Sequence, residues 1–198
     1  MRTILKSAAI FAALTTAVPA LAQVAVADLE GAVAQSAAFQ AAEGQIKTMY
    51  KAQIDAFNAR QQALATQLKP LQTEIETLQR NPATPQATLQ AKANAFRTQQ
   101  QNAQVELQRL ATPFGRPTAY AQAQVSEKLS DAVKAAMTGK SVKVIVQPDS
   151  TIAFAPDANL TPDIVTQLNT LVKTVSITPP ANWQPGQPTT AAAASKSR

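Results

Sequence analysis

The chain has 198 residues, of which 45% are hydrophobic but only 5% aromatic, and it carries a formal net charge of +6. This length suits one ordinary domain or two small ones, and 13 prolines against 5 glycines exclude a collagen-like or glycine-rich linker protein. The sequence contains no cysteine and no histidine, which excludes thiolate and imidazole metal sites, cysteine nucleophiles and histidine-based catalytic triads.

The first 22 residues have the features of a secretory signal peptide. Arg2 and Lys6 precede an uncharged, largely apolar stretch, and Ala20-Leu21-Ala22 supplies the small-residue cleavage pattern. The stretch is short for a membrane span, which needs about 20 predominantly apolar residues. We therefore expect export with cleavage after Ala22, and an uncleaved N-terminal anchor is the alternative.

Most of the remaining chain has a helical pattern, interrupted where prolines cluster. Val24–Ala27 is a short run that suits a strand, and Asp28 after it suits a helix N-cap. The expected order is a strand at 24–27, helix to residue 80, a break at 81–85, helix over 86–111, an interruption at 112–117 and helix over 118–137.

Two of these helices carry matching heptad patterns. Apolar residues recur with alternating spacings of four and three in both, each with one glutamine in the series. Folding the chain back at 81–85 gives every seam residue a partner at the same level, such as Leu64 with Ala103. The sequence therefore predicts an antiparallel coiled-coil hairpin with two seams: Tyr50, Ile54, Phe57, Gln61, Leu64, Leu68, Leu71, Ile75 and Leu78, and Leu89, Ala93, Phe96, Gln100, Ala103, Leu107, Leu110 and Phe114.

The C-terminal part has a different character. Alternation over 141–147 and apolar residues over 151–155 predict two strands, and Thr161-Pro162 suits the start of a short helix. Residues 178–198 are rich in proline and alanine and are expected to be disordered. Trp183 within them is expected to dock loosely on the rest of the protein, since a lone aromatic residue carries little binding specificity.

These elements predict a mainly helical fold with a small β part, divided into an arm and a body. The arm comprises residues 45–112 with its tip at 81–85, and the body comprises residues 23–44 and 113–177. Three short strands leave unpaired edges in one protomer, so we expect the body to be completed by oligomerisation. Prolines in or beside the arm are candidate hinges or the cause of a static curve, namely Pro70, Pro113 and Pro117, together with Gly115.

The arm is the basic part of the chain. It holds eight basic and four acidic residues. Charged residues keep a helix soluble, which is sufficient to explain this surplus of positive charge. The same surplus would also attract acidic polymers or unfolded acidic chains. Nucleic acid is disfavoured by export and by the lack of aromatic residues among these cations. The candidate contact residues are Lys47, Lys51, Arg60, Lys69, Arg80, Lys92 and Arg97.

No catalytic or cofactor-binding motif is present in the sequence. Glu74 and Glu76 lie two apart on a helix and therefore point in different directions. The aspartates of the C-terminal part fit no calcium loop, and there is no phosphate-binding glycine loop or nucleophile elbow. We expect neither enzymatic activity nor a cofactor.

Four segments of the chain resemble the Skp/OmpH family of periplasmic chaperones. They are V-A-V-A-D-L at 24–29, A-V-K-A-A-M at 132–137, V-K-V-I-V-Q-P-D-S-T-I-A-F-A at 142–155 and L-T-P-D-I-V-T-Q-L-N at 160–169. The resemblance covers about residues 24–175, and the interruption at 112–117 and the tail depart from it.

This resemblance implies a periplasmic homotrimer that holds unfolded outer-membrane proteins without ATP. Strands of three protomers would form a small β-barrel body, with three helical arms around a cavity. Anionic lipid or lipopolysaccharide is a further partner that the resemblance suggests, without identifying residues for it. The body would be built by Val24, Val26, Val142, Val144, Val146, Ile152 and Phe154.

A second hypothesis is a non-chaperone adaptor or structural coiled coil of the cell envelope that grips one folded partner. Such an adaptor should show a distinct apolar stripe outside the heptad seam. The residues outside the seam are mostly glutamine, alanine, lysine and threonine, which favours diffuse contact with many clients.

Overall fold

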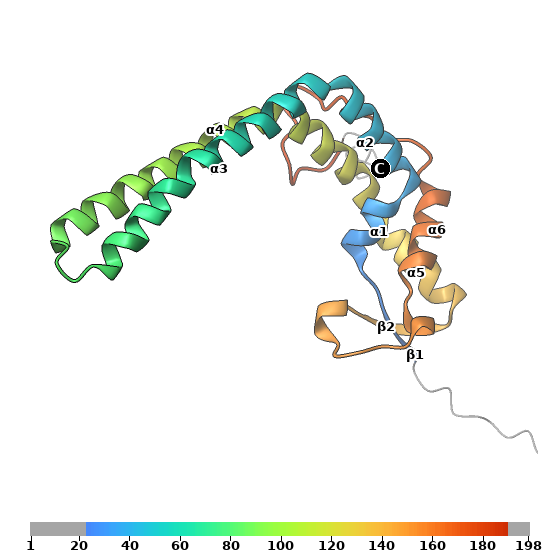
Figure 1. Cartoon of the computed structure of the whole chain (residues 1–198). Coiled ribbons are helices and arrows are strands. Elements are labelled where there is room, and N and C mark those ends of the chain that lie inside the picture. Colours follow the sequence, from blue (N-terminus) through green and yellow to red (C-terminus); the bar gives the residue numbers. More distant parts are fainter. Residues whose placement is uncertain (1–22, 190–198) are drawn as a thin grey trace, which may run out of the picture.

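The protein forms an arch with a long helical arm on one side and a compact body on the other. The computed structural model describes residues 23–189, and Figure 1 shows the arm running away from the body at an angle. Within these residues, no helix combines the length and the hydropathy that crossing a bilayer requires. The mainly helical fold with a small β part is confirmed, whereas the predicted signal peptide lies outside the described residues.

The arm is an antiparallel hairpin of two long helices. Helix α3 spans Lys51–Arg80, and helix α4 spans Gln86–Ser126 after the tight turn at 81–85. At 1.5 Å per residue these helices are about 45 and about 60 Å long. Apart from the two glutamines, all predicted seam positions are buried or half-buried. Leu64 and Ala103, at the predicted shared level, are 8% and 7% exposed. The predicted coiled-coil hairpin and its tip are therefore confirmed.

The body packs short helices against the C-terminal half of α4. Helices α1 (Leu29–Gln35) and α2 (Ala37–Met49) lead up to the arm. Helix α6 (Thr161–Leu171) packs on α1, and α5 (Leu129–Gly139) packs on α6. Asp28 caps α1 as predicted, because its Oδ1 accepts a 2.7 Å hydrogen bond from the Gly31 N–H. The largest fully buried apolar side chains are Ile164 and Leu168 of α6 and Val125 of α4, and the core around them also takes in α1, α2 and α5.

The body contains one small sheet. Strand β1 (Gln23–Val26) pairs in parallel with β2 (Val142–Val146), and on its other side the Val26 carbonyl accepts a 2.8 Å hydrogen bond from the Leu160 N–H. The predicted strand at 151–155 is wrong for the single chain. Proline-started 3₁₀ turns at Pro148–Ser150 and Pro156–Ala158 flank this segment, and among the described residues no strand pairs with it.

The predicted interruption at 112–117 is also wrong, because α4 continues through both prolines. Each proline removes one backbone hydrogen bond, but its fixed φ is compatible with helix, so flanking contacts can sustain the helix. On the outgoing side, α2 and α3 are separated at Tyr50, whose backbone leaves helical geometry. In the hairpin register the break at Tyr50 lies level with Pro117 of the continuous helix α4. The arch bends near the junction of α2 and α3 (Figure 1).

Residues 178–189 were expected to be disordered, but the structure places them against α4. Trp183 is 5% exposed, and its ring packs edge-to-face on Tyr120 with ring centroids 5.0 Å apart. Trp183 is therefore packed more tightly against the protein than the loose docking that was expected. Proline fixes the backbone in advance, so ordering this segment loses less entropy than its composition suggests.

Candidate functional site

The arm offers an open apolar groove beside the heptad seam. It has a volume of about 480 Å³ and lies between α3 and α4. It opens where the seam pairs a bulky residue with a small or polar one, as Leu64 with Ala103 and Leu68 with Gln100. The lining residues are Phe57, Leu68, Gln100, Ala103, Gln104, Leu107, Gln108 and Ala111.

The chemistry of this groove suits an extended polypeptide. Leucine, phenylalanine and alanine supply apolar contact area, and glutamine side chains provide both hydrogen-bond donors and acceptors. Gln100, Gln104 and Gln108 follow one another at intervals of four on α4, so their amides line one edge of the groove. Sequence reasoning missed this groove, although its signal was present in the pairing of leucines with alanine and glutamine.

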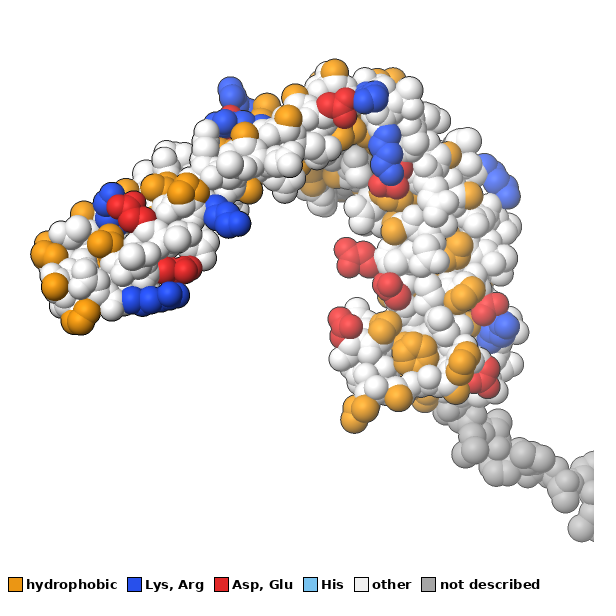
Figure 2. Space-filling view, in the orientation of Figure 1, with side chains coloured by type: hydrophobic (Ala, Val, Ile, Leu, Met, Phe, Trp, Pro, Cys, Tyr) orange, Lys and Arg blue, Asp and Glu red, His pale blue; other side chains and the backbone are white. Residues whose placement is uncertain are grey.

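The seven basic residues predicted to contact clients divide into two groups. Four form ion pairs: Lys47 with Glu43, Lys51 with Asp55, Arg60 with Glu106 and Lys92 with Glu74. In the part of the chain that the structure describes, no ion pair holds the other three, Lys69, Arg80 and Arg97. Figure 2 shows the basic side chains spread along the arm rather than gathered in one patch.

The Arg60–Glu106 pair fixes the register of the hairpin. Arg60 donates from Nε and Nη2 to the two carboxylate oxygens at 2.8 and 2.9 Å. These hydrogen bonds lower the pKa of Glu106 and raise that of Arg60. Glu74 and Lys92 form a second cross-helix pair at 2.7 Å, nearer the tip. Both pairs fit the register predicted from the heptads. Arg60 and Lys92 therefore hold the two arm helices together, which makes them poorer candidates for client contact than the cations that no ion pair holds among the described residues.

The residues predicted to build the body are largely exposed in the single chain. Val24 is 55% exposed, Val144 48%, Phe154 44%, and Ile152 is fully exposed. Val26 is buried against the core, and Val142 and Val146 are half-buried. Apolar side chains therefore lie at the end of the body remote from the arm, as Figure 2 also shows.

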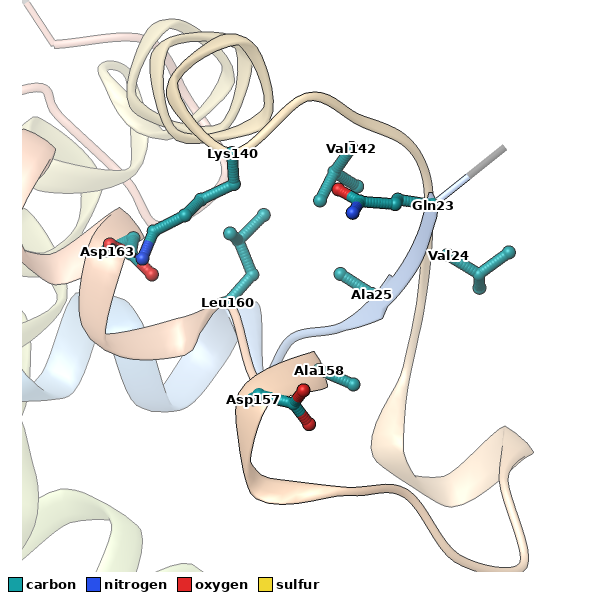
Figure 3. A pocket seen from close by; sticks show the side chains of 9 residues that line it. All are labelled: Gln23, Val24, Ala25, Lys140, Val142, Asp157, Ala158, Leu160 and Asp163. Atoms are coloured by element: carbon teal, nitrogen blue, oxygen red, sulfur yellow. Dashed lines mark ion pairs between the residues drawn. The ribbon is translucent and has the colours of Figure 1, made fainter. Parts of the chain in front are cut away.

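A hollow of about 360 Å³ lies beside β1 at this end of the body (Figure 3). Gln23, Val24 and Ala25 form one side, and the Lys140–Asp163 ion pair, at 3.3 Å, lies on the other. Among residues 23–189, no three acidic, cysteine or histidine side chains gather as metal ligands. The hollow lies beside residues 23–25 of β1, on the side away from β2. The Val26–Leu160 hydrogen bond closes that side only at the end of β1, and among the described residues no strand pairs with the rest of that side.

The candidate hinge residues lie within continuous helices. Pro70 is inside α3, and Pro113 and Pro117 are inside α4, with Gly115 between them. The two prolines of α4 lie in the part of this helix that runs from the arm into the body, whereas Pro70 lies within the arm. Whether any of them moves stays a prediction.

Comparisons with known proteins identify the family of the chain. The family model of the outer membrane protein (OmpH-like) family matches residues 23–168. One solved structure that resembles the chain is that of a proposed outer membrane chaperone (OmpH-like) from Caulobacter crescentus CB15. It is 19% identical, with a TM-score of 0.47, and the match covers 80% of this chain and 90% of that one. No curated protein matches the chain. Because the family model spans well over half of the sequence, the chain belongs to the OmpH-like outer membrane protein family.

Proposed function

We propose that this protein is a periplasmic holdase chaperone that assembles as a homotrimer and holds unfolded outer-membrane proteins between its arms. It acts by binding alone, without ATP, cofactor or catalysis. Membership of the OmpH-like family supports a chaperone role. The observation that carries the proposal is the arm itself, which projects far beyond the body and buries little more than one seam.

Two features of the arm support binding of unfolded chains. The groove between α3 and α4 offers apolar area edged by glutamine amides, which suits a peptide of variable sequence. Lys69, Arg80 and Arg97 add positive charge that the arm's own carboxylates do not neutralise. Such charges accelerate encounter with acidic clients, and many weak contacts then retain the client. Lipopolysaccharide or anionic lipid would meet the same cations.

The exposed apolar end of the body supports assembly. β2 has no second neighbour among the described strands, and β1 is paired on its far side only at Val26. Such edges associate readily with other strands. Three copies, joined through Val24, Val144, Ile152 and Phe154, would bury this surface and set three arms around a common cavity.

The first experiment measures mass by light scattering for purified residues 23–198, alone and with an outer-membrane protein diluted from urea. The expected result is a trimer that keeps one client soluble in a defined complex. A trimer that ignores unfolded clients but saturably binds one folded envelope protein would instead establish the adaptor alternative. A monomer at all concentrations would contradict the proposed assembly.

A second experiment tests the charge of the arm. Replacing Lys69, Arg80 and Arg97 with glutamine should slow capture of an acidic client at low salt, by about tenfold. The matched control replaces three exposed lysines of the body, Lys128, Lys134 and Lys173, and changes net charge equally. If both triple variants slow capture to the same extent, net charge and not the arm surface attracts the client.

A further inference from the structure

A C-terminal strap, residues 176–189, folds back from the end of α6 along α4. Figure 1 shows this trace returning to the level where the arm meets the body. The family match ends at residue 168, so the strap lies outside the part of the chain that the family model describes. Its contacts with α4 are specific and involve backbone as well as side chains.

Arg116 and Gln124 bind the backbone of the strap. The Arg116 guanidinium donates hydrogen bonds to the carbonyl oxygens of Pro180, Ala181 (2.8 Å) and Trp183 (2.9 Å). The Gln124 amide accepts from the Ser176 N–H at 3.0 Å and donates to the Ser176 carbonyl at 2.8 Å. Recognition of backbone groups in this manner is typical of sites that bind extended peptides.

Two further contacts complete the site. Trp183 packs on Tyr120 and donates from its indole nitrogen to the Gln187 carbonyl at 3.2 Å. The Glu127 carboxylate accepts hydrogen bonds from the backbone N–H and the hydroxyl of Thr189, at 2.5 and 2.6 Å. Thr189 is 1% exposed, so the end of the strap is enclosed as firmly as its middle.

Three residues of α4 and its C-cap, Glu127, form one continuous surface, here called the α4 stripe: Arg116, Tyr120, Gln124 and Glu127. Their spacings of four, four and three place them on one face of the helix. The stripe begins at Arg116, between the two prolines that each remove a hydrogen bond from α4. The strap therefore makes its first contact with α4, through Arg116, inside the stretch that lacks these two hydrogen bonds, and its other contacts follow directly after that stretch.

The conformation of the strap suits such a site. Four prolines between residues 178 and 189 restrict the free segment, which lowers the entropy lost when it binds. The turn that brings Gln187 back to Trp183 passes through Gly186, whose φ of +89° favours glycine.

We propose that the α4 stripe is a binding site for an extended, proline-rich peptide, which the chain fills with its own strap. The filled site holds α4 rigid through Pro113 and Pro117 and so sets the stiffness of the joint between arm and body. The inference does not depend on the chaperone proposal, because it concerns contacts within one chain.

The first test measures hydrogen exchange in the full chain. Trp183→Ala should raise the exchange rates of amides in 110–120 by about tenfold, while amides near the arm tip keep their rates. The matched control is Asn182→Ala, which changes an exposed neighbour in the same strap. Equal exchange over 110–120 in the two variants would overturn the bracing role.

The second test asks whether the stripe binds the strap as a separate peptide. Trp183 is the sole tryptophan of the chain, so the Trp183→Ala protein has no tryptophan fluorescence. A synthetic 176–189 peptide, which contains this tryptophan, then serves as the fluorescent probe. The peptide should bind with a blue shift of its emission and restore protection over 110–120. It should fail to bind a Trp183→Ala/Arg116→Gln double variant. Absence of binding to the first variant, or equal binding to both, would refute the peptide site.

Discussion

Gly31 and Gly44 are both helical, but the surroundings predict opposite effects of replacing them with alanine. A Cβ on Gly31 would lie 2.2 Å from Oδ2 of Asp28, whereas a Cβ on Gly44 would meet no atom within 4 Å. We expect Gly31→Ala to displace the Asp28 cap and lose about 1 kcal/mol of stability, despite the better helix propensity of alanine.

Gly44→Ala is the matched control and should gain up to about 1 kcal/mol. Urea unfolding of both variants at one protein concentration measures the difference. If both variants gain stability, the Asp28 cap contributes nothing that the helix needs.

The ion pair of Arg60 and Glu106 predicts a pH dependence. Hydrogen bonds from Arg60 lower the pKa of Glu106 in the folded protein, so the unfolded chain takes up this proton at a higher pH. The stabilisation is present above the unfolded pKa, about 4.3, and is lost as the pH falls through the lower folded value.

Urea unfolding at pH 7 and at about pH 3 compares the wild-type chain with Glu106→Gln. The wild-type chain should be the more stable at pH 7, and the difference should shrink at low pH. Glu76→Gln, which removes a charge from the same arm without breaking a cross-helix pair, should show no such convergence. If wild type and Glu106→Gln differ in stability by the same amount at both pH values, the Arg60–Glu106 ion pair does not cause the difference.

At the scale of the element, the seam of the arm is the feature on which the hairpin depends. Leu64 is 8% exposed opposite Ala103, so Leu64→Ala should cost about 2–4 kcal/mol and accelerate amide exchange in both arm helices. Gln61→Leu, one seam position earlier, places an apolar group on the seam and should slow the same exchange. If the two substitutions change arm exchange alike, seam packing does not stabilise the arm.

The same elements show what sequence reasoning can reach. The arm was predictable because its heptads, its turn at 81–85 and its partner levels are local or follow from one fold-back. The continuity of α4 was not, because Pro113 and Pro117 weaken the helix locally while contacts from distant segments support it. The predictions for 151–155 and for the strap were wrong for a similar reason, because both depend on partners distant in the sequence. A strand forms only where another strand pairs with it, and Trp183 is ordered by its contact with Tyr120.

At the scale of the whole molecule, residues 23–189 of a single chain enclose no space for a client. Its arch has one arm and one body, and the side of the arm that faces the body is open (Figures 1 and 2). A cavity requires further copies, and among residues 23–189 the large exposed apolar side chains of the body's strands and loops, Val24, Val144, Ile152 and Phe154, lie at the end remote from the arm. Assembly there would leave the arms free to surround a common space.

Two exposed valines test whether the proposed assembly surface differs from other exposed apolar area. Val144 lies on β2 and is 48% exposed, and Val105 lies on the arm and is 65% exposed. Because a lysine buried in an interface loses its hydration without gaining a partner, Val144→Lys should shift the purified protein from trimer to monomer in sedimentation equilibrium. Val105→Lys makes the same change on the arm and should leave the mass unaltered. Equal masses for the two variants would mean that the copies meet elsewhere, and the arms would then not converge on one cavity.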